Sequence, residues 1–234
     1  MYANKLIDEL KSFADYDKAM ILQRFFKTGK GEYAEGDVFL GLPVPKIRYA
    51  IKPYIIMSVA ETEILLYSEF HEIRLAGFLI LVEKFKKSKS ADEKHEIYDF
   101  YLKHACQANN WDLVDLSAQI VGEYLLDRKD RRKLYSLAES NNLWEQRISM
   151  VSTIVFIKNG DFDDAIAIAK KLLPHRHSLI HKAIGWMLRE TGKKNREILV
   201  DFLDRHATEM SRTTLRYSIE HFSPDERKKY MAMK

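Results

Sequence analysis

Leu75-Ala76-Gly77-Phe78-Leu79-Ile80-Leu81-Val82-Glu83-Lys84-Phe85 is the stretch of sequence that decides the fold. Its large apolar residues recur every three or four positions, which is the spacing of one face of an α-helix: Leu75, Phe78, Leu79, Val82 and Phe85. Segments 98–105, 113–126, 148–157, 165–173 and 180–188 show the same spacing, and no alternating run indicates a β-strand. With 9 Gly and 5 Pro in 234 residues, the chain has few of the turn residues that an all-β fold needs. The sequence therefore predicts an all-α protein.

A repeat underlies these helices. The residues expected to cap helices follow one another at intervals of 32, 36 and 33 positions: Asn110, Asn142, Ser178 and Ser211. Glu145 stands at the third helical position after Asn142, as in a capping box. A period of this length is typical of paired antiparallel helices stacked in HEAT-type arrays, whose second helices line a concave surface. We therefore predict an α-solenoid that forms one HEAT-like repeat domain over residues 1–234.

Composition restricts the class of protein. Hydrophobic residues make up 46% and charged residues 31% of the chain, as in an ordinary globular protein. No apolar run approaches the ~20 residues that a membrane-spanning helix requires, and Met1–Leu10 is too charged for a signal peptide. The single cysteine, Cys106, excludes an intramolecular disulfide and fits a reducing compartment. We expect a cytoplasmic protein without a membrane partner.

Residues 28–46 interrupt the helical pattern with several glycines and prolines. They predict a loop between an N-terminal helical pair and the array. No Gly-Lys-Ser/Thr follows at the spacing of a phosphate-binding P-loop, so that motif is excluded. The loop is either a structural connector or a connector that also touches a ligand.

One carboxylate stands in a row of cations. Arg147 follows the presumed cap Asn142, and Lys182 and Arg216 follow the next two caps at similar distances, whereas Asp115 follows Asn110. Equivalent positions of a solenoid lie along one continuous groove, so such a row favours binding of a polyanion. Each of these charged residues has the alternative of being ordinary solvated surface.

Trp111 and Asp115 are four residues apart and therefore share one helix face. Asp115 either takes part in chemistry or pairs with a cation of the next repeat, while Asp112 supports the helix dipole. Trp186 belongs either to the core or to a cleft in which it faces the indole of Trp111. Trp144 is assigned to core packing.

A metal site and a cofactor are not expected. His177 and His181 are four residues apart, but they lack an HExxH pattern and a third ligand. Cys106 has no local nucleophile signature.

Several phrases of the chain resemble those of the AlkD-type DNA alkylation repair glycosylases. They are Asn110–Asp115, Trp144–Arg147, His181–Glu190, Phe39–Arg48 and Arg212–Glu220, and the similarity runs from about Gln23 to about Phe222. The resemblance implies a HEAT-like solenoid that holds duplex DNA in a basic concave groove. It also implies excision of cationic N3- and N7-alkylated purines, usually 3-methyladenine and 7-methylguanine, from a lesion that stays largely stacked.

The resemblance implies roles for single residues as well. Trp111, Asp115 and Trp186 match the catalytic cleft, Arg147 matches an arginine that contacts DNA there, and Arg189 falls where the family contacts the DNA backbone. Three more residues are expected to bind DNA: Phe25, Lys182 and Arg216. Phe25 stands near the place where the best-known members of the family have a tyrosine, and Lys182 and Arg216 belong to the row of cations described above.

We therefore expect a monomeric DNA-alkylpurine glycosylase, an N-glycosyl hydrolase of base excision repair. Its partner is double-stranded DNA that carries alkylated purines. One alternative is a non-catalytic helical-repeat protein that binds damaged or branched nucleic acid. A second is a protein-interaction scaffold, which would present an apolar or acidic concave face.

Overall fold

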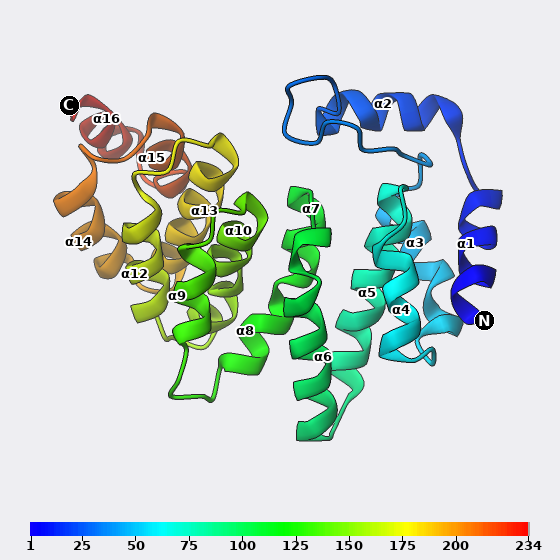
Figure 1. Cartoon of the computed structure of the whole chain (residues 1–234). Coiled ribbons are helices and arrows are strands. Elements are labelled where there is room, and N and C mark those ends of the chain that lie inside the picture. Colours follow the sequence, from blue (N-terminus) through cyan, green and yellow to red (C-terminus); the bar gives the residue numbers. More distant parts are fainter. Residues whose placement is uncertain (234) are drawn as a thin grey trace. The chain divides into compact units, whose positions relative to one another are not determined.

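The computed structural model describes residues 1–233, and this part of the chain is all-α (Figure 1). One isolated parallel bridge, between Val38 and Phe70, is the only strand-type pairing in that range. The all-α prediction is confirmed. The chain divides into two compact units, Met1–Ile120 and the residues from Val121 onward, and each is described by itself. A single repeat domain over the whole chain stays a prediction.

The amino-terminal unit is organised around one long buried helix, α5. Its helices are α1 (Tyr2–Ser12), α2 (Tyr16–Phe26), α3 (Val44–Ala50), α4 (Val59–Leu66), α5 (His71–Lys87), α6 (Ala91–Lys103) and α7 (Trp111–Ser117), with short 3-10 turns at Lys52–Tyr54 and Ala105–Gln107. Helices α3, α4, α6 and α7 pack against α5. Every residue from position 71 to position 82 is buried, so α5 is covered all round and not only on the one face that the spacing predicts, because four helices pack against it.

In the second unit the central helix is α13. This unit contains most of α8 (Gln119–Leu125), followed by α9 (Arg132–Ala138), α10 (Leu143–Ser152), α11 (Ile154–Lys158), α12 (Asp163–Leu172), α13 (Ser178–Lys194), α14 (Arg196–His206), α15 (Arg212–Ser218) and α16 (Pro224–Ala232). Helices α10, α11, α12, α14 and α15 pack against α13. Helix α15 comes close at Gly185, where an added Cβ would lie 2.5 Å from the Cβ of Tyr217.

Three of the four predicted caps are confirmed, and one moves by a residue. Asn110, Asn142 and Ser211 each accept a backbone N–H in the first turn of α7, α10 and α15. At α13 the prediction of Ser178 is wrong, because Ser178 is already helical. The preceding His177 has extended backbone, and its Nδ1 accepts the N–H of Leu179 at 3.2 Å.

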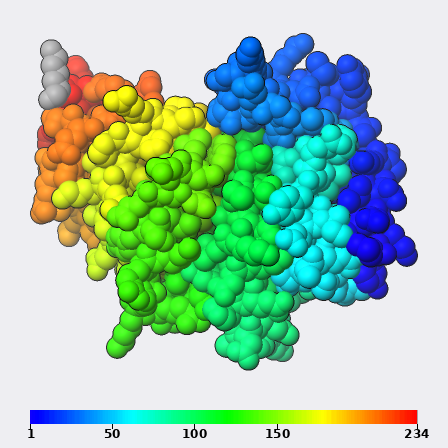
Figure 2. Space-filling model, viewed as in Figure 1, coloured from blue at the N-terminus to red at the C-terminus, as the bar shows by residue number. Residues whose placement is uncertain are grey.

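The predicted loop at residues 28–46 is present but ends earlier, because α3 begins at Val44. The loop returns along α2 to the start of that helix, where the N–H of Asp15 donates to the carbonyl of Leu40 (2.8 Å). Gly41 makes this approach possible: its φ is +86°, and a Cβ there would lie 2.2 Å from the carbonyl oxygen of Asp15. In Figure 2 the blue surface of α2 and this loop lies directly above the cyan surface of the same unit.

Candidate functional site

Trp111 and Asp115 occupy the first and second turns of α7. The helix begins after Asn110, whose Oδ1 accepts the N–H of Trp111 at 2.8 Å. Both side chains are partly exposed, and their four-residue separation puts them on one helix face. The predicted pairing of an indole and a carboxylate on α7 is therefore present in the amino-terminal unit.

The indole of Trp111 ends a column of stacked rings that we call the aromatic column: Trp111, Phe26, Phe39 and His71. Trp111 stacks on Phe26 with centroids 5.2 Å apart, Phe26 on Phe39 at 5.0 Å, and Phe39 on the imidazole of His71 at 4.4 Å. Neighbouring rings in the column are within about 20° of parallel. One face of the indole is thus supported by the core of α2 and by the loop that follows it.

Phe25 lies beside this column on the outer surface of α2. Phe25 is 62% exposed, and its ring forms a T-shaped pair with Trp111 at a centroid distance of 6.1 Å. The aromatic face expected near Trp111 is therefore available to solvent at Phe25.

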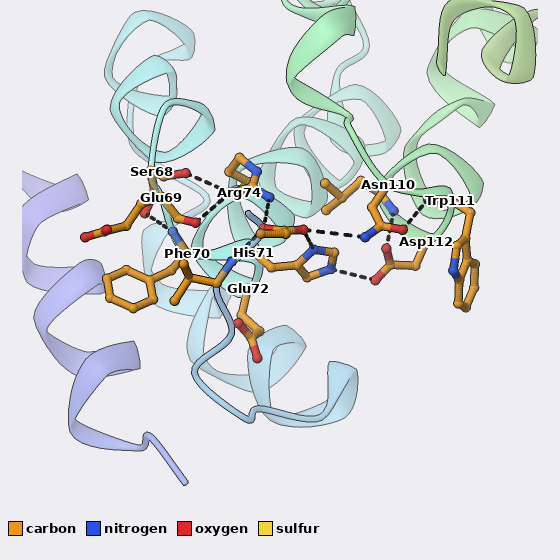
Figure 3. A network of polar contacts seen from close by, with 12 residues as sticks. Ser68, Glu69, Phe70, His71, Glu72, Arg74, Asn110, Trp111 and Asp112 are labelled. Atoms are coloured by element: carbon orange, nitrogen blue, oxygen red, sulfur yellow. Dashed lines mark hydrogen bonds and ion pairs between the residues drawn. The ribbon is translucent and has the colours of Figure 1, made fainter. Parts of the chain in front are cut away.

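At His71 the column meets a buried group of charges, the ionic cluster, made of Asp37, His71, Arg74 and Asp112. Figure 3 labels His71, Arg74 and Asp112 of this cluster. The two ring nitrogens of His71 lie between two carboxylates, with Nδ1 3.0 Å from Oδ2 of Asp37 and Nε2 2.8 Å from Oδ2 of Asp112. Arg74 Nη2 donates to the other oxygen of Asp37 at 2.6 Å. The cluster ties the loop, α5 and the first turn of α7 together.

His71 is a cation at neutral pH. Burial opposes its charge, but the charges and hydrogen bonds of Asp112 and Asp37 outweigh burial and raise its pKa to about 9. Burial likewise opposes the charge of Asp37, yet His71 and Arg74 hold the pKa of that carboxyl below its usual value. Within the ionic cluster, two carboxylates therefore face two cations.

Glu72 fixes the same loop through its backbone. Oε1 of Glu72 accepts the N–H groups of Gly41 and Leu42 at 2.8 and 3.0 Å, and Oε2 accepts the N–H of Leu40 at 2.8 Å. These residues lie next to Phe39, so Glu72 also holds the middle of the aromatic column.

The carboxylate of Asp115 lies near the buried phenol of Tyr101 on α6. Burial raises the pKa of Tyr101, a hydrogen bond with Ser117 (3.0 Å) lowers it, and the charge of Asp115 raises it further. The surroundings of Asp115 in this unit thus combine a partly exposed helix face with a neutral, buried hydroxyl.

In the second unit, Trp186 and Lys182 lie one turn apart on α13. Trp186 is partly exposed and Lys182 is exposed. Arg216 on α15 is exposed, and its Nε donates to the carbonyl of Arg212 at 3.3 Å. Arg189 is partly exposed and forms an ion pair with Glu220.

Arg147 departs from the exposed row that the sequence predicts. Its side chain is 5% exposed, and Nη1 donates to the carbonyl of Leu179 at 2.5 Å, at the start of α13. Its charge is also felt by His177: burial chiefly lowers the pKa of His177, and the charges of neighbouring histidines and Arg147 lower it further. Arg147 therefore joins α10 to α13. Trp144 is 7% exposed, which confirms its assignment to packing.

The sequence interpretation missed the ionic cluster. Asp112 was expected only to support the helix dipole, but it also contacts His71. One signal was available: His71, Glu72 and Arg74 stand in the same helix as a long apolar run, where charged side chains are buried only with partners. The partner Asp37 comes from the irregular loop, and helical periodicity says nothing about where that loop lies.

Among residues 1–233, no group of three or more His, Cys, Asp or Glu side chains is arranged to bind a metal ion. In the same range, every helix is too short or too polar to cross a lipid bilayer.

These features define an all-helical protein that presents aromatic rings, a carboxylate and exposed cations on its helices. A model of the family described as "DNA alkylation repair enzyme" matches residues 6–222. The chain therefore belongs to the DNA alkylation repair enzyme family, as the sequence phrases around Trp111 and Trp186 indicate.

A solved structure has a similar fold. It is described as a predicted DNA alkylation repair enzyme from Enterococcus faecalis, with a TM-score of 0.69 and 16% sequence identity. The similarity covers 90% of this chain and 97% of that one, and at this identity it shows the fold alone. A search of curated proteins found no match.

Proposed function

We propose that this protein is a DNA glycosylase that hydrolyses the N-glycosidic bond of cationic N3- and N7-alkylated purines in duplex DNA, in base excision repair. The substrates proposed are 3-methyladenine and 7-methylguanine. One observation carries the proposal: in a member of the DNA alkylation repair family, Trp111 and Asp115 share a partly exposed face of α7, and the indole is stacked on Phe26.

The chemistry needs only one carboxylate. A purine made positive by alkylation leaves as a neutral base, so no general acid is required to protonate it. The sugar needs help, because it gains oxocarbenium character as the glycosidic bond stretches. Asp115 stabilises that positive charge and orients the attacking water, as one of the two carboxylates does in glycosidases.

The aromatic residues select the charged base. Trp111 and Trp186 offer electron-rich faces to the cationic lesion and sugar, and each cation–π contact contributes about 0.5–2 kcal/mol depending on desolvation. Phe25 supplies an exposed aromatic face beside Trp111, in place of a tyrosine. A neutral purine gains none of this electrostatic attraction. The preference therefore acts on charge, without requiring the base to be flipped into a pocket.

Both units bind the same DNA duplex in this proposal. The helices form a HEAT-like array with a basic concave face, and Lys182, Arg189 and Arg216 contact phosphates. Arg147 supports the DNA-binding residues of α13 through its hydrogen bond to Leu179. The protein acts as a monomer.

Asp115→Asn tests the proposal most directly. The amide keeps the shape of the side chain and removes its charge. We expect release of 7-methylguanine from methylated duplex DNA to fall by about 100-fold or more while DNA affinity is retained. Asp99→Asn, at an exposed carboxylate on α6, is the matched control and should leave base release unchanged. Equal base release by Asp115→Asn and the unsubstituted protein would rule the mechanism out.

The exposed cations also suit a protein that binds damaged or branched nucleic acid without catalysis. Chromatography of bases freed from methylated duplex separates the two functions. Tight binding of the duplex with no free base from the unsubstituted protein would establish the non-catalytic function.

A further inference from the structure

Beneath the proposed catalytic indole, the ionic cluster keeps four charged side chains away from water. The imidazole of His71 is 1% exposed. Removing charged groups from water is unfavourable, and ion pairs of this kind contribute little net stability over apolar packing. What the cluster supplies is a fixed geometry, because His71 is held at both ring nitrogens.

We propose that His71, as the imidazolium cation, is a positioning residue that holds Trp111 and α7 in the geometry needed for base excision. The link to excision rests on the proposed function; the control of the indole by His71 does not. His71 touches neither base nor sugar and acts through two routes.

One route is direct. Nε2 of His71 binds Asp112, which lies next to Trp111 in the first turn of α7 and three residues before Asp115. The position and rotation of α7 are thereby fixed relative to α5. Asn110, the cap of the same helix, reaches the cluster too, with Nδ2 3.5 Å from Asp37.

The other route runs through the aromatic column. The imidazole of His71 lies flat against Phe39, and the stack continues through Phe26 to the indole. A cation over an aromatic face is attracted to it, so the protonated ring holds Phe39 more firmly than the neutral ring does. The loop that carries Phe39 is held by the same imidazole through Asp37.

Loss of the proton from His71 would disturb both routes. The charged groups that face His71 are Asp37 from the loop, Asp112 from α7, and Arg74 from its own helix through Asp37, while α2 contributes only the ring of Phe26. Neutral imidazole has one proton, so one of the two carboxylates would face a bare nitrogen lone pair. The buried site would also carry an unbalanced negative charge.

The pH window follows from the raised pKa of His71. The imidazolium contributes its full stabilisation below the unfolded-state pKa of 6.5, and the contribution is lost as the pH rises through about 9. The geometry of the indole should therefore be constant near pH 6 and change near pH 9.

The direct test follows Trp111 alone. Trp144→Phe and Trp186→Phe together leave Trp111 as the single tryptophan of the chain. We expect its fluorescence emission and its quenching by acrylamide to change with a midpoint near pH 9, and the transition to disappear in His71→Gln. The proposal would be overturned if the fluorescence of Trp111 in the Trp144→Phe, Trp186→Phe protein did not change with pH. It would also be overturned if the pH midpoint were the same with His71 and with Gln at position 71.

A second measurement needs no substitution. Nitrogen-15 NMR of the histidines in the unsubstituted protein should show one imidazole protonated at both nitrogens at pH 7, with a midpoint near 9. His104 is buried as well, so the resonances are assigned to their residues first. A His71 imidazole that is neutral at pH 7 would overturn the proposal even if His71→Gln failed to fold.

Measurements of base release test the positioning role of His71 separately from the proposed function. His71→Gln should slow single-turnover base release roughly 10- to 100-fold and flatten its decline between pH 7 and 9.5, with DNA affinity unchanged within about twofold. The matched control is His95→Gln, because His95 also contacts a carboxylate, Asp99, at 3.3 Å but is exposed. Equal rates for His71→Gln and His95→Gln would sink the positioning role alone. A titrating Trp111 in a protein that releases no base would instead sink the proposed function and leave the control of the indole by His71 standing.

Discussion

At the scale of single residues, the buried carboxylate of Glu72 holds the backbone of the loop that follows α2. Its carboxylate accepts three consecutive N–H groups of the loop, and those groups have given up their hydrogen bonds to water. A buried donor left without an acceptor costs about 1–3 kcal/mol, so the three bonds make the loop depend on this single side chain. The loop in turn carries Phe39 and holds the start of α2.

Glu72→Gln should therefore destabilise the protein by about 2–4 kcal/mol, since the amide NH₂ would face N–H donors where an oxygen accepts them now. Urea unfolding followed by circular dichroism measures the loss. Glu69→Gln provides the control, because Glu69 is exposed and should shift the free energy of unfolding by less than about 0.5 kcal/mol. Similar unfolding midpoints for the two variants would mean that Glu72 does not anchor the loop.

For single residues, the sequence predicts the features that depend on spacing between near neighbours, such as helix positions and caps. The helix from Leu75 to Phe85 and the caps Asn110, Asn142 and Ser211 follow from neighbours within one or two turns, and the structure confirms them. The spacing predicts one buried face of that helix, whereas α5 is buried all round from position 71 to position 82. The pairing of His71 with Asp37 joins positions 34 residues apart through a loop without periodicity. Spacing cannot predict such a contact, and the burial of Arg147 against Leu179 is non-local in the same way.

At the scale of helices, the approach of α15 to α13 depends on Gly185. The backbone of α15 comes so close that a Cβ at position 185 would lie 2.7 Å from the carbonyl oxygen of Thr214. Trp186 follows directly in the chain, so the seating of α13 against α15 also sets where that indole lies. A side chain at position 185 would push α15 away, because the atoms that it would contact include the backbone of Thr214, which cannot rotate aside.

Gly185→Ala should destabilise the protein by about 1–3 kcal/mol despite the better helix propensity of alanine. Thermal unfolding checks the size of the effect. Ser178→Ala on the same helix is the control: with His177 as the cap, it should cost less than about 0.5 kcal/mol. If Ser178→Ala lowered the free energy of unfolding by about 1 kcal/mol, Ser178 would be the cap after all. If Gly185→Ala left the free energy of unfolding unchanged, the close contact with α15 would be contradicted.

At the scale of the whole molecule, net charge is a weak guide to partners. The formal charge is +4, yet many cations are already engaged: Arg74 in the ionic cluster, Arg131 between Asp161 and Asp164, and Arg189 with Glu220. Each of these pairs subtracts from the field that a polyanion meets. Exposed cations outside such pairs, at Lys182 and at Arg216, are the better candidates for phosphate contacts.

Lys182→Ala should reduce the slope of log K against log salt concentration for duplex DNA by about 0.9, which is the loss of one phosphate contact. Fluorescence anisotropy at several salt concentrations measures this slope. Lys158→Ala, at the exposed end of α11 and outside the predicted row, should leave the slope unchanged. An unaltered slope in Lys182→Ala would remove that lysine from the DNA-binding set.

Helix α2 is anchored from the inside and from its ends. Ala19 and Phe26 pack inward, and the backbone of Asp15 bonds to Leu40. Tyr16, Ile21 and Phe25 point into solvent and contribute little to this anchoring. Natural variation, or a designer, can therefore exchange them at small cost to folding. Under the proposed function, the ring beside Trp111 is therefore a position where a substitution changes the contact with the damaged base while the scaffold beneath remains the same.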